Sequence, residues 1–131
     1  MTLVAGYVAT LVAFVAADMV WLGIMVERVY RPAIGDILST TVNLPAAILF
    51  YLLFPVGLTI FVVLPAVKDQ SAGNAALFGG LFGFFAYATY DLTNQATLRN
   101  WPTQLTIIDL VWGSALAAFA ATIGYLVASR F

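Results

Sequence analysis

The sequence predicts an all-α membrane protein, a four-helix transmembrane bundle that runs up, down, up and down. Of its 131 residues, 63% are hydrophobic and only 8% are charged, whereas a soluble domain has roughly 45–50% apolar and 25% charged residues. Four apolar runs are each long enough to cross about 30 Å of hydrocarbon. Polar connectors separate these runs and hold most of the charges. We therefore expect a single integral membrane domain over residues 1–131, with spans at about 3–25, 44–67, 75–98 and 104–128.

The first run and its connector are the first elements in the chain. Residues 3–25 carry neither a positively charged leading segment nor a small-residue cleavage pattern, so we expect a retained helix. The connector 27–43 mixes apolar and charged residues, and Pro32 suits a first helical position. We therefore expect a short interfacial helix over 32–38, with Asn43 as the N-cap of the second span.

The other three spans differ in how closely they can pack. The second has Pro55 at its middle among bulky side chains, so we expect a kinked helix and the most lipid-exposed of the four. The third carries Gly79 and Gly83, and the fourth has small residues from Gly113 onward at four-residue spacing. We expect a homodimer through the Gly79–Gly83 face or through the second helix. The positive charges at the two ends nearly balance, which leaves the orientation open.

Composition excludes several kinds of chemistry. The chain has no cysteine and no histidine, so disulfides, thiol and imidazole catalysis and a structural zinc site are excluded. A net charge of −1 without a basic block argues against nucleic acid as a partner. We assign no metal ligand and name no cofactor, and any activity must depend on carboxylates, hydroxyls, amides or water.

Three aspartates lie at one predicted depth in the membrane. With both termini at the bottom, Asp18 and Asp91 stand roughly 22–24 Å above the lower boundary by helix rise. Asp109 enters from the top and lies about 7 Å below it, at nearly the same height. An acid inside a span costs about 2.5–3.5 kcal/mol on insertion scales and normally faces the bundle interior or a wet cavity. The three carboxyls are therefore the candidate site.

Aromatic and polar residues accompany these acids. Trp21 and Trp112 each follow an aspartate at i+3, so the first and fourth helices present the same acid and indole pair. This echo is compatible with an inverted repeat. We place both tryptophans in the pocket wall and Trp101 in an interfacial aromatic belt. The ligand-binding residues we expect are Asp18, Trp21, Tyr87, Asp91, Asn94, Asp109 and Trp112.

Several functions agree with such a pocket. The leading hypothesis is binding or translocation of a cation, a proton or a small cationic ligand, because carboxylates supply charge and indoles supply cation–π faces. A membrane enzyme that uses aspartates on a lipid or amphiphile is an alternative, although no nucleophile motif is present. An accessory subunit of a membrane complex is another. A purely structural role is also open, with the acids paired to Arg28, Arg31 or Arg99, or hydrogen-bonded across helices.

The motifs also resemble a known family. Asp18-Met-Val-Trp21-Leu-Gly23, Tyr90-Asp91-Leu-Thr93-Asn94, Trp101-Pro102 and Asp109-Leu-Val-Trp112-Gly113 together look like a bacterial family of predicted membrane proteins of unknown function. The resemblance covers nearly the whole chain. It implies a small integral protein of the bacterial inner membrane and supplies no activity or catalytic residue.

Overall fold

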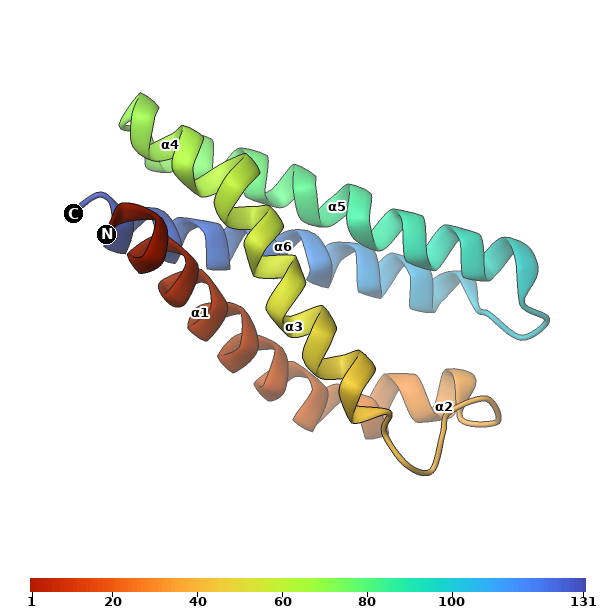
Figure 1. The fold of residues 1–131 in the computed structure, drawn as a ribbon. Coiled ribbons are helices and arrows are strands. Elements are labelled where there is room, and N and C mark those ends of the chain that lie inside the picture. The colour runs from red at the N-terminus through yellow and green to blue at the C-terminus, as the bar shows by residue number, and fades with distance from the viewer.

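The computed structural model describes all residues from 1 to 131 and contains only helices and connectors. Four helical stretches are long and apolar enough to cross a membrane: Thr2–Ile34, Leu44–Asp69, Ala72–Thr97 and Thr103–Ala128. They alternate in direction, and the two termini lie together at one end (Figure 1). The predicted fold class is confirmed.

The first stretch is longer than predicted. It consists of α1 (Thr2–Met25), the π-helical turn η1 (Val26–Tyr30) and α2 (Arg31–Ile34), without a break between them. The short helix after the first span is therefore present, but it continues that span and ends at Ile34, so the expected bounds of 32–38 are wrong. Pro32 lies just after η1 in this continuous stretch and has no N–H to extend the helical hydrogen-bond ladder, so the winding changes locally at this point.

The second stretch consists of α3 (Leu44–Leu58), the π-helical turn η2 (Thr59–Val63) and α4 (Leu64–Asp69). The Asn43 side chain caps α3 by accepting from the Ala46 N–H at 3.3 Å, as predicted. The π-helical turn begins four residues after Pro55, where the Thr59 hydroxyl donates to the Pro55 carbonyl at 2.7 Å. Such a local change in winding is the usual consequence of a proline inside a helix.

The expectation that the second span is the most lipid-exposed is wrong. In the most apolar part of each span, 28% of the residues are buried in the second and 22% in the first. The lower half of the second span enters the core, where Leu58, Val62 and Val63 are buried against α1 and α6. Its upper part, α3, contacts α1 and diverges from α5.

The last two helices, α5 (Ala72–Thr97) and α6 (Thr103–Ala128), pack closely along their lengths. A Cβ atom added at Gly83 would lie 2.3 Å from the Gly113 carbonyl oxygen, and one at Gly79 would lie 2.8 Å from the Ala121 Cβ. The small residues therefore serve contact within the chain. Within the chain, α6 covers the Gly79–Gly83 face, and the homodimer stays a prediction.

Two apolar clusters hold the bundle. The larger surrounds Phe14, Leu58 and Leu116, and the smaller joins Ile34, Trp101 and Leu105 at the end opposite the termini. The assignment of Trp101 to an interfacial belt is wrong, since Trp101 is 8% exposed and its indole N–H donates to the Thr106 hydroxyl at 3.1 Å. Packing against α2 buries this ring, and a belt residue would instead face the headgroups.

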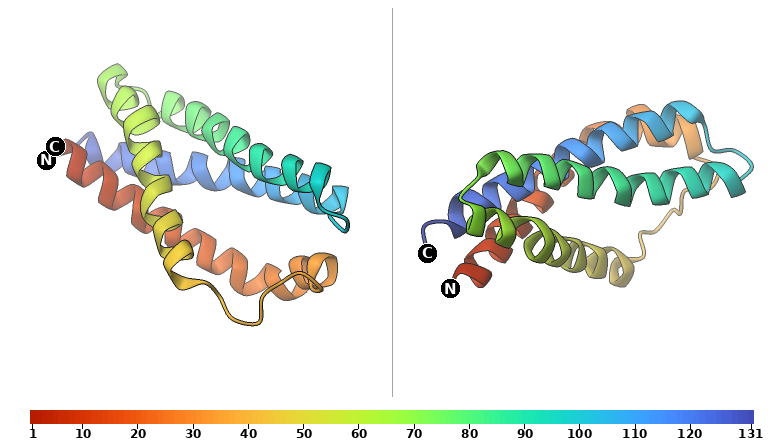
Figure 2. Two further views of the ribbon diagram at one scale, coloured as in Figure 1. Left: turned by 45° about the vertical axis from the view of Figure 1, so that its right-hand side comes forward. Right: turned by 90° about the horizontal axis from the view of Figure 1, so that it is seen from above.

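The second span crosses the bundle obliquely. In Figures 1 and 2, α4 lies beside the start of α5, whereas α3 runs away from α5 towards α1 and the loop before it. The contacts agree, since α3 packs on α1 while η2 and α4 contact α5 and α6. This crossing leaves the upper halves of α3 and α5 apart, at the level of the aspartates.

Candidate functional site

Asp18 joins three helices through two hydrogen bonds. Its carboxylate accepts from the Trp112 indole N–H of α6 at 3.0 Å and from the Tyr51 hydroxyl of α3 at 2.5 Å. The residue is only 6% exposed. Each carboxylate oxygen has a donor, so the charge of Asp18 is compensated by oriented dipoles rather than by a cation.

Asp109 is held by a relay from the first span. The Tyr30 hydroxyl, in η1, donates a short hydrogen bond to the Asp109 carboxylate. The Tyr30 oxygen in turn accepts from the Trp21 indole N–H at 3.1 Å. Asp109 is 5% exposed, and the π-helical turn matters here because it carries Tyr30.

The two indoles stack between these acids. The rings of Trp21 and Trp112 are nearly parallel, with centroids 4.3 Å apart and planes inclined by 6°. Each indole N–H serves the aspartate of the opposite helix, directly from Trp112 to Asp18 and through Tyr30 from Trp21 to Asp109. The repeated acid and indole pairs of α1 and α6 therefore face each other.

Asp91 differs from the other two acids. It is completely buried in α5, and neither carboxylate oxygen has a hydrogen-bond partner. Its carboxyl lies beside that of Asp109, within reach of a shared hydrogen bond. Neither carboxylate can donate, so such a bond exists only when one of the two carries a proton. Close packing of α5 on α6 at Gly83 brings these acids together. We call Asp91 and Asp109 the acidic pair.

Tyr87 and Asn94 share the face of α5 that carries Asp91, as their spacing predicts. The Tyr87 ring covers Gly113, where an added Cβ would meet the ring at 2.2 Å. The ring is partly buried, its hydroxyl makes no hydrogen bond with the protein, and it lies within electrostatic range of Asp18 and Asp109. Asn94 is half-buried nearer the C-terminal end of α5. Tyr87 therefore lies near Asp18 and Asp109, and the assignment of Asn94 to the site stays a prediction.

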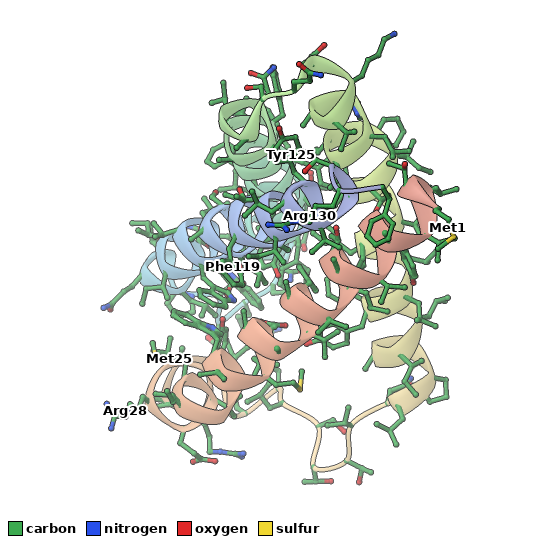
Figure 3. The ribbon with its side chains drawn as sticks, turned by 90° about the vertical axis from the view of Figure 1, so that its left-hand side faces the viewer. Met1, Met25, Arg28, Phe119, Tyr125 and Arg130 are labelled. Carbon is green, nitrogen blue, oxygen red and sulfur yellow. The ribbon has the colours of Figure 1, made fainter.

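No arginine forms an ion pair in the polar layer, which comprises the three aspartates, their hydrogen-bond partners and Tyr87. Arg31 pairs with Glu27 at 2.9 Å, and both side chains are exposed at the membrane surface. Arg28 and Arg99 are also exposed, and Arg28, labelled in Figure 3, lines a depression beside the start of α6 without an ion pair to any of the three aspartates. The structural alternative in which arginines neutralise the acids is therefore wrong. Hydrogen bonds across helices do hold Asp18 and Asp109, but not Asp91.

The carboxyls do not converge as one set of three ligands. Asp18 is turned towards Tyr51 and Trp112, and only Asp91 and Asp109 lie side by side. The carboxyl oxygens without a hydrogen-bond donor are therefore those of Asp91, in the acidic pair. The Tyr87 hydroxyl, which also makes no hydrogen bond, lies on the same helix.

Two residues of the layer were missed from the sequence. Tyr30 falls in a predicted connector, and Tyr51 stands alone among apolar side chains of the second span. The signal for Tyr51 was present, since a hydroxyl inside hydrocarbon needs a partner. For Tyr30 no comparable signal exists, because its place depends on the first helix continuing through η1.

Comparisons with known proteins agree with this architecture. A search of curated proteins and of solved structures found no match. A family model described as "Predicted membrane protein (DUF2177)" matches residues 3–126, which include all four spans except their outermost residues. The chain therefore belongs to this family of predicted membrane proteins.

Proposed function

We propose that this protein binds a small monovalent cation, a proton or a small ammonium ion, at the acidic pair inside the membrane. One observation carries the proposal: Asp91 is fully buried beside Asp109, and no protein group donates to either of its oxygens. Buried polar groups in proteins are nearly always satisfied, so an exception of this kind indicates a missing partner.

Electrostatics defines the chemistry of that partner. Two like charges about 4 Å apart repel by about 4 kcal/mol at an effective dielectric constant of about 20. A proton or a cation between the carboxyls removes this repulsion, whereas an anion would increase it. The Tyr87 hydroxyl and ring lie on the same face of α5, and an aromatic face adds cation–π attraction.

Asp18 supports the site without being a ligand in this proposal. Each of its two oxygens already accepts a hydrogen bond, from Trp112 or from Tyr51. Asp18 therefore contributes negative potential and no unbonded oxygen. The stacked indoles are connected by hydrogen bonds to Asp18 and, through Tyr30, to Asp109. Their fluorescence can therefore report changes at the acids. A cation that enters the acidic pair would change the field at Trp21 and Trp112, and hence their emission.

The decisive experiment titrates the protein in phosphatidylcholine nanodiscs and follows tryptophan emission. The Trp101→Phe background removes the one indole outside the layer. Sodium, potassium and methylammonium chlorides replace bulky N-methylglucamine chloride at constant ionic strength, and a pH indicator counts the protons released. We expect a saturable change with at least one cation, accompanied by proton release, and its loss in Asp91→Asn.

Asp69→Asn is the matched control because Asp69 is an exposed aspartate at the membrane surface. It removes the same charge outside the layer and should leave the response intact. The proposal fails if no cation gives a saturable response, or if Asp69→Asn and Asp91→Asn reduce it equally. Uptake of methylammonium into proteoliposomes tests whether binding leads to translocation.

The four spans place the chain in a lipid bilayer. Within this proposal that bilayer is the bacterial inner membrane, on the basis of the bacterial family that the motifs resemble. A cation site in that membrane would meet the proton and ion gradients across it.

A further inference from the structure

An aromatic groove opens beside the polar layer that contains the aspartates. It has a volume of about 340 Å³ and is lined by Phe50, Phe54, Ala86, Tyr87 and Tyr90, from α3 and α5. It exists because α3 runs away from α5 above Pro55, so these two helices do not close on each other (Figure 1). We call it the aromatic groove.

The aromatic groove faces the hydrocarbon of the bilayer. Phe50 is 41% exposed and Tyr90 is 54% exposed, and both belong to spans that cross the membrane. Exposed apolar side chains at this depth lie against lipid tails rather than water. An apolar molecule therefore reaches the groove sideways, from within the membrane.

One wall of the groove is formed by Tyr87, a residue of the polar layer. Tyr87 lines the groove, and its ring packs on Gly113 of α6, one turn from Asp109. Tyr51 stands beside Phe50, with ring centroids 5.2 Å apart, and donates to Asp18. Tyr87 thus borders the groove on one side and lies near Asp18 and Asp109 on the other.

We propose that the aromatic groove takes the alkyl tail of an amphiphilic amine whose ammonium group binds at the acidic pair. This inference rests on the proposed function and names its substrate class. Charge complementarity selects the headgroup, since neither the groove nor the layer contains a basic side chain and an anionic amphiphile would meet buried carboxylates. The lining selects the tail, because all five residues present apolar or aromatic surface.

The test compares octylammonium, methylammonium and octanol on the nanodisc protein, with tryptophan emission as the readout. The key variant is Ala86→Phe, which fills the groove from α5. We expect it to weaken octylammonium binding by about tenfold or more, because the phenyl ring occupies the space of the alkyl tail, and tenfold corresponds to about 1.4 kcal/mol. Methylammonium, which has no tail to place, should bind as in the wild type, and this response also shows that the variant is folded. Ala86→Leu repeats the test with a smaller side chain.

Ala115→Phe is the matched control. Ala115 lies in another lipid-facing depression, formed with Phe84, Leu110, Val111 and Ser114, which contains none of the three aspartates. This variant should change neither amine. An equal loss of octylammonium binding in Ala115→Phe and Ala86→Phe would overturn the inference, because it would reflect general perturbation of the membrane surface.

The remaining outcomes separate the two proposals. If Asp91→Asn abolishes the methylammonium response but Ala86→Phe leaves octylammonium unchanged, the cation site stands and the groove proposal is wrong. If octanol competes as well as octylammonium, the groove holds lipid tails alone and the inference is wrong. If neither amine depends on Asp91, the inference is wrong, and the proposed function itself fails if no other cation depends on Asp91 either.

Discussion

Trp112 donates its indole N–H to Asp18 of the opposite helix while its ring stacks on Trp21, with centroids 4.3 Å apart. One side chain thus links α6 to α1 by a charge-assisted hydrogen bond and by aromatic contact. Both interactions lie in the membrane, where no water replaces a lost donor. The polar layer therefore contributes to stability as well as forming the candidate site.

The two indole N–H groups should differ in their effect on stability. Trp112→Phe leaves Asp18 short of one donor and should lower the free energy of unfolding by about 1–2 kcal/mol beyond the loss of ring area. Trp21→Phe removes a bond to the neutral Tyr30 hydroxyl and should cost less. Denaturation in detergent, followed by circular dichroism, measures both. A larger loss for Trp21→Phe would show that Asp18 does not depend on Trp112.

The Tyr51 hydroxyl should matter more than that of another tyrosine in the membrane. Tyr51→Phe removes the 2.5 Å hydrogen bond to Asp18, and we expect a loss of about 1–2 kcal/mol. Tyr7→Phe is the control, because the Tyr7 hydroxyl donates to the Leu52 carbonyl at 3.0 Å at an exposed position. The Leu52 carbonyl lies inside a helix and keeps its backbone hydrogen bond, so Tyr7→Phe should lower the free energy of unfolding by only a few tenths of a kcal/mol. Thermal melts of both variants check the order, and equal shifts would contradict it.

Replacing aspartate by asparagine should have opposite effects at Asp91 and Asp18. In Asp91→Asn an amide N–H becomes available to the Asp109 carboxyl and the repulsion disappears, so stability should stay equal or rise by about 1 kcal/mol. In Asp18→Asn one oxygen is replaced by an NH₂ group that faces the donors of Tyr51 and Trp112, so stability should fall.

Thermal melts at constant ionic strength compare these two variants with the wild type. The Asp91→Asn protein should also lose every cation response described above while remaining folded. If Asp91→Asn unfolds the protein and Asp18→Asn does not, the acidic pair is structural. The proposal that the Asp91 oxygens bind a cation is then wrong.

The contact between α5 and α6 should tolerate a methyl group at Gly80 and not at Gly83. Gly83→Ala would place a Cβ 2.3 Å from the Gly113 carbonyl oxygen, so the helices must separate and stability should fall by about 1–3 kcal/mol or more. Gly80→Ala meets nothing closer than 3.7 Å and should be neutral or stabilising by up to about 1 kcal/mol.

Unfolding in detergent gives both values. Gly83 lies about 12 Å along α5 from Asp91 and sets the contact between α5 and α6, so Gly83→Ala should also weaken the cation response. Gly80→Ala should leave that response unchanged. Similar destabilisation by the two substitutions would contradict the packing described for this helix pair.

Much of the architecture was predictable because it depends on local properties of the chain. A transmembrane helix satisfies its backbone within the segment, so hydropathy and length are enough to locate four spans. Height along a helix is proportional to residue number, which is why Asp18, Asp91 and Asp109 could be placed at one depth before any packing was known. The small residues of the third and fourth spans were likewise readable as a close contact, although not as a contact within one chain.

The sequence alone determined the four spans, their alternation and the depth of the three acids, since each follows from helix rise and from the cost of polar groups in lipid. Only the tertiary structure decided which acid meets which donor, because the rotation of a helix about its axis and its crossing angle depend on side-chain packing with other helices. That packing buried Trp101, continued the first helix through η1 to bring Tyr30 to Asp109, and turned α3 away from α5 to open the aromatic groove. It also left Asp91 without a partner, which no spacing in the sequence indicates.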